Sequence, residues 1–231
     1  LQRHNIPFES AMAKGRNMAM FWHIKSGAET ASRNLALERG EAPDAQGTGM
    51  RNCHLLAIAP NASSSIICGN TSPSIEPYRA NAYTQKTKSG TSLQKNEYLE
   101  DLLRDLGMDT DDVWKSIVTN GGSVAHLEFL DDWTKDVFKT AVEIDQRWVI
   151  DMAADRQKHI CQSQSLNVFF PADVSKMELH AIHMQAWKQK VKTLYYLRSE
   201  AYKRAEKVSD EALRQQIFES MDENACLACE G

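Results

Sequence analysis

The sequence predicts an α/β protein in which short apolar segments alternate with helix-forming stretches. Three observations lead to this prediction. The apolar runs at 53–59 and 166–170 have the length of buried strands, helix-forming stretches flank them, and the 231 residues contain no internal repeat and no Gly/Ser-rich linker. We therefore expect part of a larger α/β architecture rather than two independent domains.

The first two thirds of the chain predict helix, strand, loop and helix in that order. Residues 8–40 are rich in Ala, Met, Lys and Arg and favour a helix. The run CHLLAIA at 53–59 has the length of a buried strand, with a helical turn as the alternative. From Pro60 to Gly90, Ser, Asn, Thr, Gly and Pro dominate, which predicts a long loop of the kind that usually serves binding. Helical spacing of apolar residues resumes at 96–106, and a longer helix is expected over 130–159.

The last third predicts a strand, a helix and a charged tail. LNVFF at 166–170 favours a strand, and Ser175 and Glu178 have the spacing of a capping box that opens a helix. Residues 192–197 look extended. Residues 199–221 are charged and helix-prone with little apolar surface, and we expect them to form a mobile arm.

Composition excludes several classes of protein. A hydrophobic fraction of 42% and a charged fraction of 25% are typical of a compact globular core. The net charge of -4 and the pI of about 6.0 do not favour nucleic acid as a direct partner, and no apolar run of about 18 residues predicts a membrane span. Five cysteines without an export signal indicate reduced thiols in a cytoplasmic protein, and the start LQRHNIPFES suggests that the chain begins mid-protein.

The loop residues Pro60, Asn61, Ala62, Ser63 and Ser64 follow directly on the first predicted strand. Small residues leave backbone N–H groups and hydroxyls uncovered, and these can converge on phosphate oxygens, especially where a helix begins at the end of the loop. A Ser-rich surface turn has the same composition, and no Gly-Lys-Ser signature of a P-loop accompanies it. The residues alone leave both interpretations open.

Cys226 and Cys229 form a CxxC pair near the end of the sequence. Two thiols at this spacing can form a disulfide or supply half of a metal site. A zinc site needs further ligands, and no second paired spacing supplies them. Exposure at a chain terminus favours thiol–disulfide exchange, with an incidental spacing as the alternative.

Tyr195 and Tyr196 are adjacent aromatic residues in an apolar context. Neighbouring aromatics on a strand usually point to opposite faces and usually serve packing. A role in radical transfer would be invisible to composition.

His180 and His183 have a helical spacing that could bind a metal. His183 also lines up on one helical face with Trp187, Val191 and Leu194, which favours core or interface packing instead. We expect no metal site in the chain.

Four segments together resemble the large subunit of class I ribonucleotide reductases. MRNCHLLAIAPNASSSIICGNTSPSIEPYRANAY from Met50 to Tyr83 carries most of the likeness, and QSQSLNVFF from Gln162, AWKQKVKTLYYLRS from Ala186 and the closing CLAC follow in the family's order. The resemblance runs from about residue 20 to Ser199 and includes the last few residues. It implies the carboxy-terminal part of a ten-stranded α/β barrel over residues 1–198, and a flexible charged tail over 199–231.

The resemblance also implies a role for each candidate. The loop from Pro60 to Ser64 would hold the diphosphate of a ribonucleoside diphosphate. Tyr195 and Tyr196 would end a proton-coupled electron-transfer chain from a small, metal-containing radical subunit, while this chain itself would bind no cofactor. Cys226 and Cys229 would be the mobile dithiol that re-reduces the active site and is reset by thioredoxin or glutaredoxin.

The same comparison of motifs implies an enzyme that is incomplete alone. The thiyl-forming cysteine and the two reducing cysteines belong to an upstream part, and Cys53, Cys68 and Cys161 do not match their contexts. We expect reduction of ribonucleoside diphosphates only after assembly with the upstream piece and the small subunit, within a large-subunit dimer. A phage gene split by a mobile element would place the enzyme in the host cytoplasm. The alternative is a non-catalytic remnant that binds the small subunit or another partner.

Overall fold

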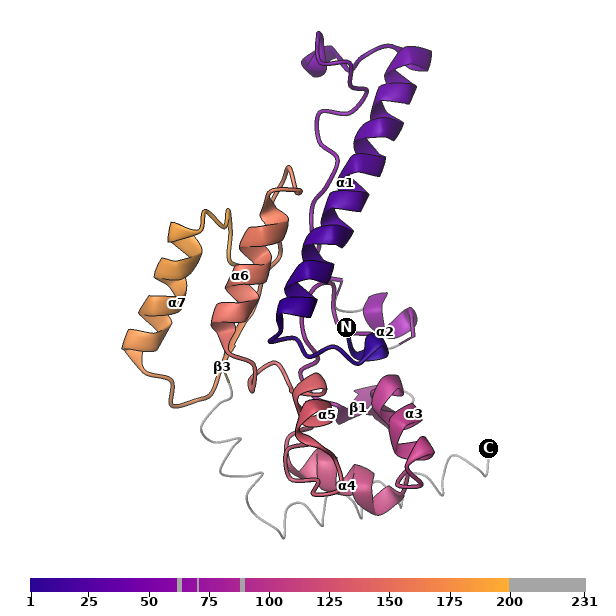
Figure 1. Cartoon of the computed structure of the whole chain (residues 1–231), viewed down its shortest axis with the longest axis vertical. Helices are drawn as coiled ribbons and strands as arrows, with labels where there is room; N and C mark the ends of the chain where they lie inside the picture. Colours follow the sequence, from indigo (N-terminus) through magenta and orange to yellow (C-terminus); the bar gives the residue numbers. More distant parts are fainter. Residues whose placement is uncertain (62–63, 70, 88–89, 200–231) are drawn as a thin grey trace.

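The structure is a computed structural model that describes residues 1–61, 64–69, 71–87 and 90–199. The chain combines helices with short strands, which confirms the predicted α/β class (Figure 1). The elements are a 3-10 turn (Gln2–His4), α1 (Ala11–Arg39), a second 3-10 turn (Pro43–Ala45), α2 (Ser64–Ile67), β1 (Ala82–Thr87), β2 (Gly90–Lys95), α3 (Glu97–Asp105), α4 (Asp111–Thr119), α5 (Asp132–Val137), α6 (Gln146–Gln157), β3 (Val168–Phe170), α7 (Lys176–Lys188) and β4 (Leu197–Ser199).

Helix α1 confirms the predicted helix over 8–40. The Ser10 side chain caps its start by accepting the Ala13 N–H, and Gly40, with a φ of 77°, ends it. Its first half packs beside α6, while its far end extends away from the body of the molecule (Figure 1). Only Ala13 and Ser32 of this helix are buried.

Three extended segments run parallel and side by side. β3 pairs with β4 in the register Val168 to Leu197, and Ile58 forms a single parallel bridge with Gln164. The predicted strand at 166–170 is confirmed as the three residues of β3. The predicted strand at 53–59 is wrong in extent, because hydrogen bonds to residues 162–165 form only around Leu56 and Ile58.

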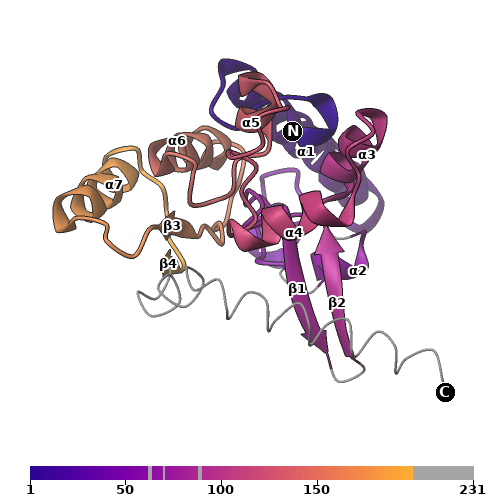
Figure 2. The same ribbon diagram turned by 90° about the horizontal axis from the view of Figure 1, so that it is seen from below.

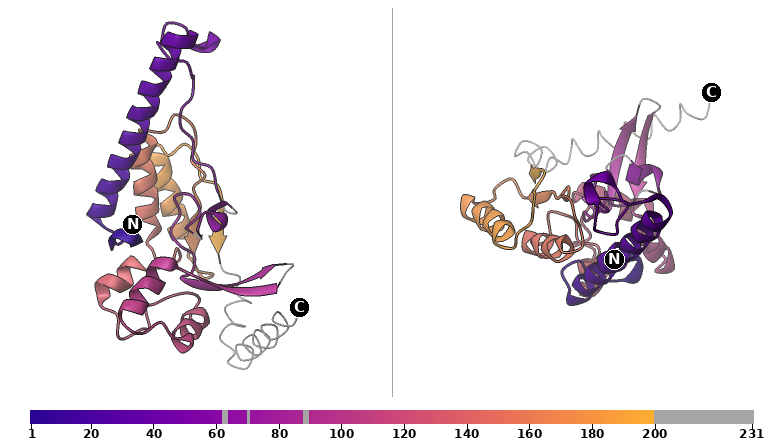
Figure 3. Two further views of the ribbon diagram at one scale, coloured as in Figure 1. Left: turned by 90° about the vertical axis from the view of Figure 1, so that its right-hand side faces the viewer. Right: turned by 90° about the horizontal axis from the view of Figure 1, so that it is seen from above.

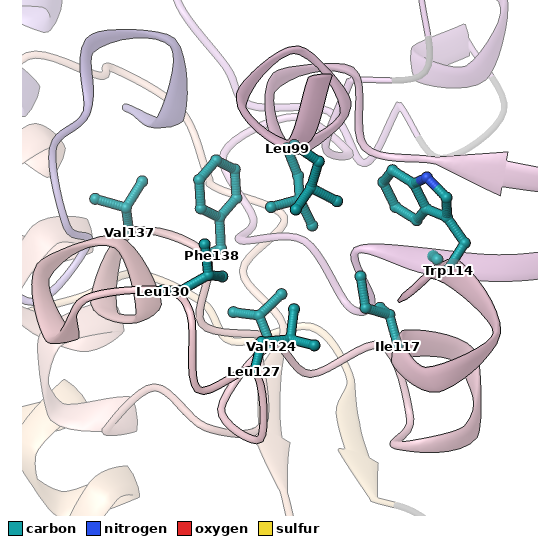
Figure 4. Packing of buried hydrophobic residues seen from close by; sticks show 10 residues of the cluster. Leu99, Trp114, Ile117, Val124, Leu127, Leu130, Val137 and Phe138 are labelled. Carbon is teal, nitrogen blue, oxygen red and sulfur yellow. The ribbon is translucent and has the colours of Figure 1, made fainter. Parts of the chain in front are cut away.

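Three hydrophobic cores hold the described residues together, and the smallest of them consists of Ile6, Ala13 and Met152. The first joins β1 and β2 to α3, α4 and α5 (Figure 4), and its buried residues are Ala82, Leu99, Leu103, Trp114, Ile117, Val124, Leu127, Leu130, Val137 and Phe138. The second packs α6 and α7 around β3, and its buried residues are Ile144, Val149, Ile150, Ala153, Leu166, Val168, Phe170, Ile182 and Ala186. The second core therefore supports the parallel segments.

The loop prediction for Pro60 to Gly90 is wrong where β1 begins. β1 and β2 form an antiparallel hairpin that projects from the body in two different views (Figures 2 and 3). Their sequences, AYTQKT and GTSLQK, carry no apolar run that would predict a strand. Main-chain hydrogen bonds and cross-strand side-chain pairs stabilise the hairpin. Helix α4 was not predicted either.

The single helix expected over 130–159 is two helices. Residues between α5 and α6 form turns, in which the Glu143 carboxylate accepts hydrogen bonds from the N–H and hydroxyl of Thr140. Asp145 then caps the start of α6 by accepting the Arg147 N–H. Such local side-chain bonds compete with continuous helix, so they interrupt a stretch whose composition is helix-forming throughout.

Helix α7 begins as the capping box predicts, because the Ser175 side chain accepts the Glu178 N–H. Its packed face consists of Ile182 and Ala186. His183 and Trp187 are exposed, so the core packing predicted for their face is wrong for these two residues, whereas Val191 and Leu194 pack against the second core.

Candidate functional site

The candidate phosphate loop leaves the parallel segments directly after Ile58. Pro60, Asn61 and Ser64 are exposed, and Asn61 has a left-handed φ of 45°. Its carbonyl accepts the Ser65 N–H at 3.1 Å, and α2 starts at Ser64, so a short helix does begin at the end of the loop. Ala62 and Ser63 lie outside the described residues.

The rings of Tyr195 and Tyr196 are in contact. Their centroids are 4.2 Å apart with planes inclined by 55°, and the two side chains are 55% and 49% exposed. Interaction with the neighbouring Tyr196 phenol, which favours the protonated form of Tyr195, raises the pKa of Tyr195. The expectation that adjacent aromatics face opposite ways and serve packing is therefore wrong here.

The start of the loop and the tyrosine pair lie at the same level along the parallel segments, on opposite sides of the middle segment. The Ile58–Gln164 bridge lies two residues before Pro60 on one segment and two before Leu166 on the next. The Leu166 carbonyl accepts the Tyr195 N–H at 2.8 Å. Two steps between adjacent strands, each about 4.8 Å, place the start of the loop on the order of 10 Å from the tyrosine backbone.

Side-chain hydrogen bonds fix the segment that leads into the tyrosines. Lys192 donates to the Cys161 carbonyl at 2.6 Å, and the Thr193 hydroxyl donates to the Gln164 carbonyl at 2.9 Å. Gln164 is itself buried, and its side chain donates to the Ala153 carbonyl of α6. The approach to the pair is therefore anchored to the second core.

A buried carboxylate lies behind the tyrosine pair. Glu76 is 5% exposed; its Oε1 accepts a hydrogen bond from the Asn167 amide, and its Oε2 lies 3.8 Å from Arg79. Burial raises the pKa of Glu76, although Arg79, Arg198 and Asn167 oppose that shift. The Arg198 guanidinium lies 5.0 Å from the centroid of the Tyr196 ring. No sequence signal pointed to Glu76, because its partner is 91 residues away.

A cavity of about 320 Å³ opens between the amino-terminal residues, α1 and α6. Its wall includes Phe8, Met20, Phe21, Glu76 and Arg156, and none of the predicted site residues. Arg156 is 3% exposed and donates to Gln164, and burial lowers its pKa to about 9. No sequence pattern indicated this cavity, since its lining comes from distant segments.

The cysteines divide into described and undescribed residues. Cys53, Cys68 and Cys161 are free and exposed. Cys161 accepts hydrogen bonds from the N–H groups of Leu55 and Leu56 at 3.1 and 3.2 Å. Cys226 and Cys229 lie outside the described residues. Among the residues that the structure describes, no three His, Cys, Asp or Glu gather as a metal site would require.

Comparison with known proteins identifies what the chain is similar to. The family model for the ribonucleotide reductase barrel domain matches residues 42–197. The large subunit of ribonucleoside-diphosphate reductase from Invertebrate iridescent virus 6 is 52% identical over 213 residues, which are 90% of this chain and 22% of that protein. The putative large subunit from Frog virus 3 is 47% identical over 231 residues, all of this chain and 40% of that protein.

A solved structure has the same fold. The class Id ribonucleotide reductase alpha subunit of Actinobacillus ureae superposes with a TM-score of 0.81 at 41% identity, covering 87% of this chain and 37% of that one. The chain thus spans between 22% and 40% of the length of these relatives. Within the described ranges, no helix combines the length and apolar character needed to cross a membrane.

Proposed function

Because this chain belongs to the ribonucleotide reductase large-subunit family and carries its barrel-domain sequence, we propose that it works in the reduction of ribonucleoside diphosphates to 2'-deoxyribonucleoside diphosphates. It would supply the loop for the substrate diphosphate, a tyrosine relay and a redox-active dithiol. The contact between the Tyr195 and Tyr196 rings is the observation that carries this proposal.

The tyrosine contact suits transfer of an electron together with a proton. Two phenols in contact can pass a proton from one to the other, while rings whose centroids are 4.2 Å apart can exchange the electron. Both rings are about half exposed, so each can meet a further redox group supplied by another part of the enzyme. A metal-containing radical small subunit would supply the oxidising equivalent, and an active-site cysteine of the large subunit would receive it.

The loop suits a diphosphate. Asn61 and Ser64 are exposed, a left-handed turn at Asn61 directs successive peptide groups around a bend, and α2 starts within the loop. Backbone N–H groups and hydroxyls there would donate to phosphate oxygens and fix the ribose near the relay. The start of the loop lies on the order of 10 Å from the tyrosine backbone, two strand spacings away, which is compatible with one substrate meeting both.

The remaining parts of the reaction would come from other polypeptide segments and proteins. The thiyl-forming cysteine and the two cysteines oxidised in turnover would lie in the rest of the large subunit. Exposed apolar side chains along α1 suit contact with that part, namely Met12, Met18, Met20, Trp22, Ile24 and Leu37. We expect this chain to self-associate when expressed alone, and a stable, cooperatively unfolding monomer would contradict that expectation.

The decisive experiment measures ribonucleoside diphosphate reduction by this chain mixed with the upstream part of the large subunit and the radical-bearing small subunit. Each component is omitted in turn. Turnover only in the full mixture would support the proposal, as would its loss in Tyr195→Phe and Tyr196→Phe variants that still assemble. No turnover despite assembly would favour a non-catalytic subunit that only binds the small subunit, and full turnover in both Phe variants would remove the relay.

The dithiol tail has a separate test. Replacing Cys226 and Cys229 with Ser should abolish turnover with thioredoxin or glutaredoxin and spare turnover with a small dithiol, which can reach the active-site disulfide directly. Equal loss with both kinds of reductant would indicate structural damage and not a redox role.

A further inference from the structure

The backbone at the tyrosine pair departs from a regular strand. In a regular strand, successive N–H groups point to opposite edges and successive side chains to opposite faces. Here the N–H groups of both Tyr195 and Tyr196 reach the same neighbouring segment. Tyr195 donates to the Leu166 carbonyl at 2.8 Å, and Tyr196 donates to the side-chain oxygen of Asn167 at 3.0 Å. The departure brings the two rings together.

Asn167 is the acceptor that makes this backbone possible. A main-chain carbonyl is already used by Tyr195, so the Tyr196 N–H needs a partner that the regular ladder does not offer. The Asn167 side chain can accept this N–H only if its amide oxygen faces Tyr196. Its amide nitrogen then faces Glu76, which accepts from it. The carboxylate therefore selects the orientation of the amide.

Glu76 is in turn held in place. Its second oxygen lies 3.8 Å from Arg79, and the Arg79 guanidinium sits 5.7 Å from the centroid of the Phe169 ring on β3. Both Glu76 and Asn167 are buried, at 5% and 3% exposure. A buried amide with a fixed donor side and a fixed acceptor side has one orientation.

We propose that Glu76 and Asn167 are positioning residues for the tyrosine pair, setting the Tyr196 backbone so that its ring meets Tyr195. The functional consequence rests on the relay proposed above, whereas the geometry does not. If Glu76 and Asn167 only satisfied each other's hydrogen-bonding groups, substituting them would leave the contact between the tyrosine rings unchanged. Positioning predicts that the contact depends on the donor and acceptor pattern of these two side chains.

The test exchanges that pattern in the assembled large subunit carrying 3-fluorotyrosine at position 196. Asn167→Asp sets two carboxylates against each other, while Glu76→Gln combined with Asn167→Asp restores one donor facing one acceptor and still offers an oxygen to Tyr196. Asn167→Ala removes the acceptor without adding charge and serves if Asn167→Asp does not fold. The readouts are the fluorine NMR signal of residue 196 and turnover with saturating substrate.

We expect the fluorine signal to move toward that of free 3-fluorotyrosine in Asn167→Asp and Asn167→Ala, and to return in the double variant. Turnover should fall roughly tenfold to a hundredfold in the single variants with the substrate KM unchanged, and recover in the double variant, because small misplacements of reacting groups slow transfer strongly. An unchanged fluorine signal in both single variants would overturn the inference. If Tyr195→Phe and Tyr196→Phe keep turnover, the relay fails, and the fluorine signal still decides the positioning role.

Discussion

Replacing Gly122 with Ala tests how the segment that carries Glu76 is attached to the first core. Gly122 has a φ of 85°, and a Cβ added there would lie 2.3 Å from the Ala80 Cβ and 2.6 Å from the Ala80 Cα. Ordinary carbon contacts are about 3.5–4.0 Å, so the backbone must move. It is held by hydrogen bonds from the Asn81 N–H and the Asn81 side chain to the Gly122 carbonyl, each 3.0 Å.

The adjacent Gly121 provides a matched control. Its φ is 66°, and an added Cβ would meet nothing within 4 Å. Gly121→Ala should therefore cost only the left-handed conformation, about 1–2 kcal/mol. Gly122→Ala should cost that amount and a further 1–3 kcal/mol or so for overpacking, giving about 2–5 kcal/mol in total. That total is a large share of the roughly 5–15 kcal/mol that stabilises a typical domain.

The assay is urea unfolding of the assembled large subunit, followed by tryptophan fluorescence because Trp114 is buried in the first core. The midpoint should fall clearly further for Gly122→Ala than for Gly121→Ala. Equal losses in the two variants would refute the reasoning, because they would show that conformation alone, and not the close approach to Ala80, sets the cost.

Three further predictions concern side chains whose surroundings are unusual. Trp114→Phe should lower the unfolding free energy by about 1–2 kcal/mol in urea titrations, since the smaller ring leaves space in the core and loses the 2.7 Å hydrogen bond to Asp109. Burial opposes ionisation of the Cys161 thiol, but hydrogen bonds from backbone groups outweigh burial and lower the pKa of Cys161. Iodoacetamide should therefore modify Cys161 faster than the exposed Cys68 near pH 7.5, and equal rates would contradict this prediction. Burial raises the pKa of Glu76 above its usual 4.5, so the stability that Glu76 contributes is present below pH 4.5 and is lost as the pH rises through the folded pKa. The Glu76→Gln variant should therefore become more stable relative to the wild type over that pH range. A difference in unfolding free energy that stays constant with pH would count against this prediction.

Much of the helical framework could be predicted from local sequence. Ser10 and Ser175 cap helices where the sequence predicts starts, and Asn96 caps α3 by accepting the Tyr98 N–H at the start of the segment predicted from its leucine spacing. These signals are local because a cap needs only the next few residues. The break between α5 and α6 was missed because it depends on hydrogen bonds from Thr140 to the Glu143 carboxylate, which the helix-forming composition of this stretch does not reveal.

Strands were harder to predict because their pairing is remote. Ile58 needs Gln164, and Val168 needs Leu197, so neither length nor partner can be inferred from one segment. The hairpin β1–β2 was missed for a different reason. Most of its residues are polar, and Ala82 and Leu93 supply its hydrophobic contacts to the first core, so no periodicity separates it from a loop.

The tyrosine pair illustrates why the residues of the candidate site could be identified from the sequence, while their geometry could not be predicted from it. Period-two alternation, a sound rule for a regular strand, predicts that Tyr195 and Tyr196 face apart, whereas their rings touch. The exception is made by Asn167, whose side chain takes the place of a main-chain acceptor, and Asn167 depends on Glu76, 91 residues before it. If the relay needs that contact, the two buried polar residues are constrained as strongly as the tyrosines, although neither carries any chemical signature of its own. A local motif can therefore identify the reacting groups, while the geometry that lets them react is encoded in residues that look like ordinary buried polar side chains.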